Sequence, residues 1–135
     1  MDPTSPHYVG FIDGASIWYP NLASTAWVIY SLSHEFIPID RMCVGIATNN
    51  QVEYDGVVGI LTTALHLGSL FLDVFLDSQL LVSQLNNCYR VCDPYLFIKF
   101  LRTRQLVIHF KSISFMHVPR ILNSVADEMA NETLE

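Results

Sequence analysis

Residues 70–76 read Leu-Phe-Leu-Asp-Val-Phe-Leu, a run in which Asp73 is the single polar side chain. A short apolar run of this kind predicts a strand that is buried on both faces, as in a parallel sheet. Gly68, just before the run, is typical of a helix end, and residues 78–86 after it have the spacing of a short helix. A buried strand between two helices indicates an α/β fold.

Three β-rich segments come earlier in the chain, at residues 8–13, 27–32 and 36–46. Because they follow one another with no helical pattern between them, they predict an antiparallel meander. A helical pattern of apolar residues then begins at the cluster 48–50 and ends at Gly68.

The rest of the chain predicts two more helices and one more strand. A helix is predicted from Asp93 and Pro94 to about Arg104, a strand lies within residues 106–118, and Asn123 caps a last helix that runs to about residue 134. The order β-β-β-α-β-α-α-β-α predicts one five-stranded mixed sheet, with three antiparallel and two parallel strands, flanked by helices.

Composition limits the class of protein. The chain has 135 residues, of which 51% are hydrophobic and 15% charged, so it has enough apolar surface for one folded domain and is not intrinsically disordered. We expect residues 1–6 to be a flexible lead-in and residues 7–135 to be a single domain excised from a longer polyprotein. This expectation rests on the polar start and on a helical pattern that continues to the last residue.

The sequence also predicts where the protein works. It has no apolar run of about 18 residues and no secretory signal at its start, so we expect no membrane span and no secretion. Three cysteines are too few and too odd in number for a disulfide framework, which favours a reducing compartment, the cytoplasm or the nucleus. Cys88 and Cys92 are spaced to share a helix face, but two cysteines without further ligands make a poor zinc site.

Four acidic residues stand at positions where the pattern is otherwise apolar. Asp13 and Asp77 end predicted strands, Glu53 heads the apolar stripe of the first helix, and Asp127 lies near the start of the last helix. Taken singly, each is explained as a turn, cap or helix-dipole residue. Strand ends and helix starts meet at one rim of an open α/β sheet, however, and four acids gathered there would repel one another without cations. Two divalent ions such as Mg²⁺ or Mn²⁺ would balance them, which is a recurring arrangement in phosphodiester chemistry.

Four motifs in a fixed order resemble the type 1 ribonuclease H family. They are DGAS at 13–16, TNNQVEY at 48–54, DSQ at 77–79 and HVPRILNSVAD at 117–127, and together they cover nearly the whole chain. The tyrosine after the glutamate, the HVPR segment and DPYLFIKFLR at 93–102 most resemble the ribonuclease H domains of plant long-terminal-repeat retrotransposon polyproteins, which also contain a reverse transcriptase.

The resemblance implies hydrolysis of the RNA strand of RNA–DNA hybrids, leaving a 5′-phosphate and a 3′-hydroxyl. Asp13, Glu53, Asp77 and Asp127 match the catalytic quartet that binds two Mg²⁺ ions, with Mn²⁺ as a substitute. His117, ten residues before Asp127, matches the catalytic histidine of the family; the alternative is a histidine packed at a strand end.

The resemblance also implies a set of substrate contacts. Amide side chains are suited to this role because they both donate to and accept from the 2′-hydroxyls in the wide minor groove of a hybrid, while small residues let a strand approach the backbone. The alternative for the two asparagines is capping of the helix that they begin. The substrate-binding candidates are Gly14, Ala15, Ser16, Asn49, Asn50, Gln79, Arg120 and Asn123.

Two features depart from the family pattern. Residues 17–21 read IWYPN, a bulky aromatic segment that offers either an altered substrate rim or a partner surface. The net charge is −6, whereas nucleic-acid binders are usually basic. Three basic residues share one predicted helix, where they either contact the DNA backbone or form a solvated face: Lys99, Arg102 and Arg104. We therefore expect weak hybrid binding by the isolated domain, with neighbouring reverse transcriptase or other polyprotein domains supplying further grip.

Two other functions compete with the nuclease. One is a catalytically weak or inactive ribonuclease H-like module with a structural or interaction role. The segment Trp18–Asn21 and the high hydrophobicity favour this alternative, and the complete carboxylate quartet disfavours it. The other is an integrase-like or exonuclease relative on the same sheet, which fits less well because TNNxxE and DSQ are not its motifs.

Overall fold

The computed structural model describes residues 7–16, 23–31, 36–45 and 49–119, and for residues 13–16, 23–24, 26, 31, 36–45 and 49 it describes the backbone alone. The elements are β1 (His7–Ser16), β2 (Ala23–Ser31), β3 (Phe36–Gly45), α1 (Asn49–His66), β4 (Phe71–Leu76), α2 (Gln79–Leu85), α3 (Pro94–Val107) and β5 (Ser112–His117). These eight elements have the predicted order. The predicted ninth, the helix that begins at Asn123, lies outside the described residues.

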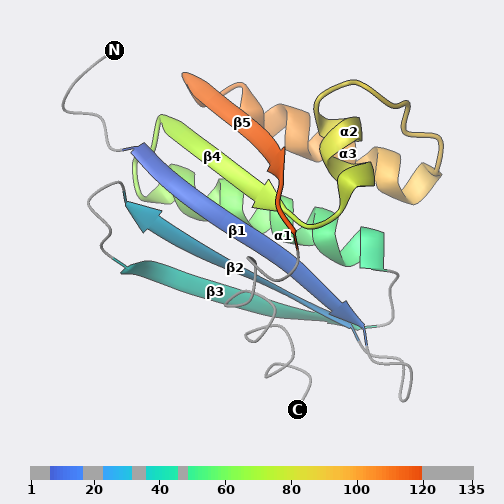
Figure 1. Ribbon diagram of the computed structural model, residues 1–135, viewed down its shortest axis with the longest axis horizontal. Coiled ribbons are helices and arrows are strands. Elements are labelled where there is room, and N and C mark those ends of the chain that lie inside the picture. The colour runs from blue at the N-terminus through green and yellow to red at the C-terminus, as the bar shows by residue number, and fades with distance from the viewer. Residues whose placement is uncertain (1–6, 17–22, 32–35, 46–48, 120–135) are drawn as a thin grey trace.

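The five strands form one mixed sheet in the order β3-β2-β1-β4-β5 (Figure 1). The β1–β2 and β2–β3 pairs are antiparallel, and the β1–β4 and β4–β5 pairs are parallel. The prediction of three antiparallel strands extended by two parallel strands is therefore confirmed. Helix α1 packs across β1 and β2, and α3 packs against α1 on the same side of the sheet.

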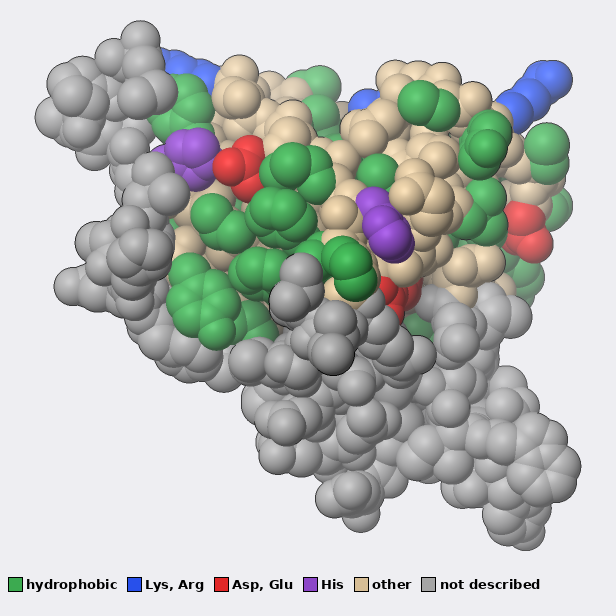
Figure 2. Space-filling model, viewed as in Figure 1, with side chains coloured by type: hydrophobic (Ala, Val, Ile, Leu, Met, Phe, Trp, Pro, Cys, Tyr) green, Lys and Arg blue, Asp and Glu red, His purple; other side chains and the backbone are tan. Residues whose placement is uncertain are grey.

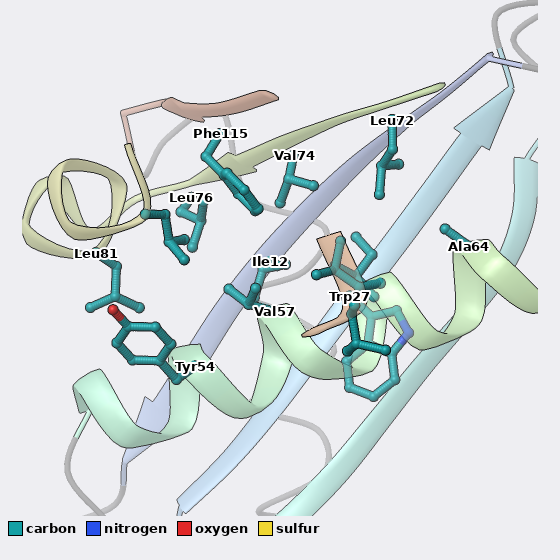
Figure 3. Packing of buried hydrophobic residues seen from close by; sticks show 14 of the residues in the cluster. Ile12, Trp27, Tyr54, Val57, Ala64, Leu72, Val74, Leu76, Leu81 and Phe115 are labelled. Carbon is teal, nitrogen blue, oxygen red and sulfur yellow. The ribbon is translucent and has the colours of Figure 1, made fainter. Parts of the chain in front are cut away.

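Helix α1 supplies most of the core on that side. Val57, Ile60 and Ala64 are fully buried, which confirms the predicted apolar stripe behind Glu53, and they lie with Ile12 and Trp27 in one cluster (Figure 3). The indole Nε1 of Trp27 also donates a hydrogen bond to Oγ1 of Thr63, 3.1 Å away. The helix ends as predicted, because Gly68 has a φ of +78°, a left-handed conformation that favours glycine.

Burial alternates along β4, so the prediction that this strand is buried on both faces is wrong. Leu72, Val74 and Leu76 are buried, whereas Asp73 and Phe75 between them are only half-buried. The half-buried side carries its own apolar contact, because Phe75 stacks on Phe11 of β1 with ring centroids 5.2 Å apart. Figure 2 shows apolar side chains gathered over this face of the molecule, with Lys and Arg at its margins.

The last helix–strand boundary differs from the prediction. Asp93 caps α3 as expected, accepting hydrogen bonds from the backbone amides of Tyr95 and Leu96 at 2.8 and 3.1 Å. The helix then continues to Val107, past the predicted end at Arg104, because Leu106 extends its buried side into the core. For that reason β5 begins only at Ser112.

Cys88 and Cys92 lie in the loop between α2 and α3, where both are exposed free thiols. The expectation that their spacing puts them on one helix face is therefore wrong. No helix in the described part of the chain is both long and apolar enough to cross a membrane.

Candidate active site

Two of the predicted carboxylates lie where the pairing of β1 with β4 ends. The prediction that Asp13 ends its strand is wrong, because β1 stays paired with β2 as far as Ser16, whereas Asp77 does directly follow β4. The parallel pairing of β1 with β4 reaches Ile12 and Leu76, and Asp13 and Asp77 are the next residue on each chain. Neighbouring strands run about 4.8 Å apart, so the two backbones carry these aspartates side by side. Asp77 is half-buried, and its position directly after a strand leaves it at the edge of the core.

The packing of α1 brings Glu53 to the same end. A methyl group on Gly10 would overlap Ile60, and one on Gly56 would overlap Ile12, so α1 runs antiparallel to β1. From Gly10 to Ile12 the strand advances about 6.6 Å, and from Ile60 to Gly56 the helix advances about 6 Å, so the two elements stay level.

Glu53 lies about one helical turn beyond Gly56, toward the start of α1. Asp13 lies one residue beyond Ile12, toward the end of β1, so both acids lie in the same direction from the Gly56–Ile12 contact. The carboxyl-bearing side chain of Glu53 is only 5% exposed, an unusual degree of burial for a glutamate. The direction of the helix and the register of the strands therefore gather Asp13, Glu53 and Asp77 at one end of the sheet.

The chemistry of this donor set fits a hard divalent cation. Carboxylate oxygens are the ligands that Mg²⁺ and Mn²⁺ prefer, and burial of a carboxylate such as Glu53 is favourable only when its charge is compensated. Among the residues whose side chains are described, no three His, Cys, Asp or Glu side chains form a metal-binding group. The structure does not describe the side chain of Asp13 or any part of Asp127. The geometry of the four predicted carboxylates as a set therefore lies outside the described residues.

His117 is the last residue of β5 and pairs in register with Leu76, the residue before Asp77. Its side chain is exposed, so the alternative of a histidine packed into a strand end does not hold. The amide of Val118 donates to the carbonyl of Leu76 at 2.9 Å, which extends the β4–β5 pairing past the histidine and holds it beside Asp77.

The described substrate-contact candidates lie at the same end of the molecule. Asn49 and Asn50 are the first two residues of α1, with Asn50 half-buried, and Gln79 is the exposed first residue of α2. Ser78 caps α2 by accepting from the amide of Leu81 at 3.3 Å. The backbone of residues 14–16 forms the end of β1 after Asp13. Arg120, Asn123 and residues 17–21 lie outside the described part.

Comparison with known proteins agrees with this arrangement. The sequence profile described as reverse transcriptase-like matches residues 12–133. Ribonuclease HI of Halobacterium salinarum is 38% identical over 125 residues, which cover 93% of this chain and 63% of that protein. The RNase H1 crystal structure from the same archaeon has a TM-score of 0.90 at 37% identity and covers 95% of this chain and 97% of that one.

The chain belongs to the ribonuclease H-like, reverse transcriptase-like family.

Two further relatives support this assignment. The bifunctional protein Rv2228c of Mycobacterium tuberculosis is 32% identical over 124 residues, or 91% of this chain and 34% of that protein, and its N-terminal RNase H domain has a TM-score of 0.88. LC11-RNase H1, whose structure is a complex with an RNA/DNA hybrid, has a TM-score of 0.86 at 27% identity over 93% of this chain and 94% of that one. The chain thus spans 63% and 34% of the lengths of the two curated relatives. The narrower resemblance to plant retrotransposon domains stays a prediction.

This domain contains a buried polar pair that the sequence pattern did not reveal. The hydroxyl of Tyr54 donates a 2.7 Å hydrogen bond to Oε1 of Gln84, and both side chains are buried. Burial raises the pKa of Tyr54 from 10.0 to about 12, while the positive charge of Arg104 acts in the opposite direction. The available signal was a glutamine within the apolar run of residues 80–85.

Two of the three basic residues on α3 are engaged in contacts within the domain. Nζ of Lys99 pairs with Oδ1 of Asp55 on α1 at 2.5 Å. Arg104 donates to the carbonyl of Leu85 and to Oδ1 of Asn87, each at 2.7 Å, and its guanidinium lies 4.8 Å from the ring centroid of Phe100. These contacts hold the helical layer together, so they disfavour the interpretation of this face as a grip on the DNA backbone.

Proposed function

We propose that this domain is a divalent-metal-dependent endonuclease that hydrolyses the RNA strand of RNA–DNA hybrids and leaves a 5′-phosphate and a 3′-hydroxyl. The observation that carries the proposal is the arrangement of Asp13, Glu53 and Asp77 at one end of the sheet in a chain of the ribonuclease H family. The hybrid bound in the LC11-RNase H1 structure supports the choice of substrate.

The metal site would be formed by Asp13, Glu53, Asp77 and Asp127, with Mg²⁺ as the physiological ion and Mn²⁺ as a substitute. Two bound ions would activate the attacking water and stabilise the leaving 3′-oxygen. Glu53 contributes a carboxylate held rigidly by a buried helix, and Asp77 one fixed by the end of β4. A rigid ligand set keeps the reacting groups aligned, which is most of what this chemistry requires of the protein.

Proton transfer and strand choice fall to residues around the carboxylates. His117 is exposed beside Asp77, and an imidazole is a common general acid–base group, so it would assist departure of the 3′-oxygen or release of product. Asn50 and Gln79 carry amides at the starts of α1 and α2, where they would read the 2′-hydroxyls of the RNA strand.

Neighbouring domains would supply additional grip on the hybrid. Lys99 and Arg104 are already engaged in contacts within the protein, which leaves fewer cations for phosphate groups. A reverse transcriptase or another domain of a longer polyprotein is the partner that we propose. The inactive interaction module is the second candidate, favoured by exposed apolar side chains on α3 such as Tyr95 and Ile98.

The deciding experiment incubates the domain with a hybrid labelled on its RNA strand, in Mg²⁺ or Mn²⁺. The wild type should cleave the RNA, and Asp77→Asn and Glu53→Gln should each lose at least roughly 100-fold in rate, about 3 kcal/mol of transition-state stabilisation.

The matched control is Asp55→Asn, an equal chemical change on the same helix, two residues from Glu53. Asp55 pairs with Lys99 rather than facing the site, so this variant should keep its activity. Intact RNA in every lane, with a folded wild-type protein, would overturn the nuclease and favour the interaction module.

A further inference from the structure

The buried hydrogen bond between Tyr54 and Gln84 joins the two helices next to the carboxylates. Tyr54 directly follows Glu53 on α1, and its hydroxyl end points toward Leu81 of α2 in Figure 3. Gln84 lies on α2, thirty residues along the chain, and is 5% exposed, while Tyr54 is fully buried. A hydrogen bond between two buried neutral groups fixes their relative orientation. Removal of one partner leaves the other buried without a hydrogen bond, which costs free energy.

Helix α2 transmits this contact to Asp77. It begins at Gln79, only two residues after Asp77, and Ser78 between them caps it. Its seven residues advance about 10 Å, which makes it a short and stiff connection. A shift of Gln84 relative to Tyr54 therefore becomes a shift of Asp77 relative to Glu53.

The other end of α2 is fixed independently from α3. Arg104 donates to the carbonyl of Leu85, the last residue of α2, and to the side chain of Asn87 just beyond it. Asn87 has a φ of +62°, so the turn that leaves α2 is defined by its backbone as well. With its end held by Arg104, α2 is fixed relative to α1 by the Tyr54–Gln84 bond together with the apolar packing of Leu81 and Leu85 in the core.

We propose that Tyr54 and Gln84 are positioning residues that set the separation of Glu53 from Asp77 and thereby the affinity of the site for its divalent ion. The inference rests on the proposed function, in which Glu53 and Asp77 are metal ligands. Neither residue touches the reacting atoms. Their role is that of an outer partner of the ligands, and loss of such partners typically weakens metal binding roughly 10- to 100-fold.

The test measures Mn²⁺ binding by titration calorimetry without any hybrid, so that its readout is independent of cleavage. Tyr54→Phe, which removes only the hydroxyl, should weaken Mn²⁺ binding roughly 10-fold. The control is Trp27→Phe, which removes a different hydrogen bond to α1, at Thr63, far along the helix from Glu53. This control should lose stability and keep its Mn²⁺ affinity.

A double variant separates positioning from stability. Tyr54→Phe with Gln84→Leu leaves no polar group without a partner, so it should recover stability relative to Tyr54→Phe while its Mn²⁺ binding stays weak. The double variant also provides the measurement if the single variant does not fold.

Three outcomes are distinguishable. Weak Mn²⁺ binding in both Tyr54→Phe and the double variant, with unchanged binding in Trp27→Phe, supports the inference. Wild-type Mn²⁺ affinity in the double variant overturns the inference and leaves the nuclease intact, provided that Glu53→Gln does weaken binding. A wild type that binds no Mn²⁺ and cleaves no hybrid overturns the proposed function and the inference with it.

Discussion

Alanine in place of Gly56 tests how closely α1 lies on the sheet, and thereby the position of Glu53. A methyl group at this position would overlap Cγ2 of Ile12 and Oγ1 of Thr25. Both are β-branched side chains with a stiff χ1, on the neighbouring strands β1 and β2. Because neither can turn aside at low cost, the substitution must move α1 away from the sheet.

Two opposing terms set the size of the effect. Alanine in a helix interior is favoured over glycine by about 1 kcal/mol. Overfilling a packed core costs about 1 to 3 kcal/mol. We expect Gly56→Ala to lose about 1 kcal/mol of unfolding free energy, up to about 2 kcal/mol where the strands do not yield at all. A displacement of about 1 Å at the helix would also reach Glu53, three residues away, and misplacement on that scale can cost roughly 100-fold in rate.

The assay compares urea unfolding and hybrid cleavage for the wild type, Gly56→Ala and Gly68→Ala. Gly68 is the matched control, because it has a positive φ and open space around its Cα. Alanine there should cost about 1 to 2 kcal/mol from backbone strain alone and leave cleavage unchanged. If Gly56→Ala instead became more stable by the helix-propensity term and kept full activity, the close packing of α1 on β1 would be refuted.

Three further outcomes follow from charges and ionisable groups. The folded-state pKa of Tyr54 is about 12 against 10.0 for the ordinary group, so the stability that this shift contributes is complete below pH 10 and is lost as the pH rises to 12. Relative to Tyr54→Phe, the wild type should lose about 1 kcal/mol between pH 9 and pH 11, measured by urea unfolding. Lys99→Met should cost at most about 1 kcal/mol, an effect that shrinks in 1 M NaCl because its ion pair with Asp55 is partly exposed. The isolated domain should bind hybrid only weakly at physiological salt, and a nanomolar dissociation constant by fluorescence anisotropy would contradict the expectation that it depends on neighbouring domains.

Elements with local end signals could be predicted closely from the sequence. Helix α1 ends before Gly68 because only the glycine tolerates the left-handed turn, and α3 begins after Asp93 because that carboxylate accepts from two backbone amides. Boundaries that depend on distant packing could not be predicted in this way. Residues 105–107 suit a strand or a helix equally by local pattern, and the burial of Leu106 against the core decides for the helix.

The residues of the candidate site likewise differ in how far the sequence could predict them. Asp77 and Glu53 stand out in the sequence because each is an acid at a position where the surrounding pattern is apolar. Gln84 also stands out as a polar residue within a mostly apolar run, but its pairing with Tyr54, thirty residues away in the chain, depends on how α1 and α2 pack together. The alternating burial along β4 could not be predicted from the sequence either. Phe75 has the apolar side chain of a core residue, but it stacks on Phe11 on the half-buried side of the strand.

The net charge of the protein bears on the proposed role of divalent cations at the carboxylates. The net charge is −6, and two divalent ions would bring the formal charge to about −2. Within the described chain, Lys99 is committed to Asp55 and Arg104 to the end of α2, both in the helical layer beside α1. Lys99 therefore holds α3 to α1 through Asp55, and Arg104 holds α3 to α2 through the carbonyl of Leu85. Both cations act between helices. Under the proposed function the metal ions would balance the charge of the four carboxylates, so metal removal should abolish cleavage and restore mutual repulsion among them.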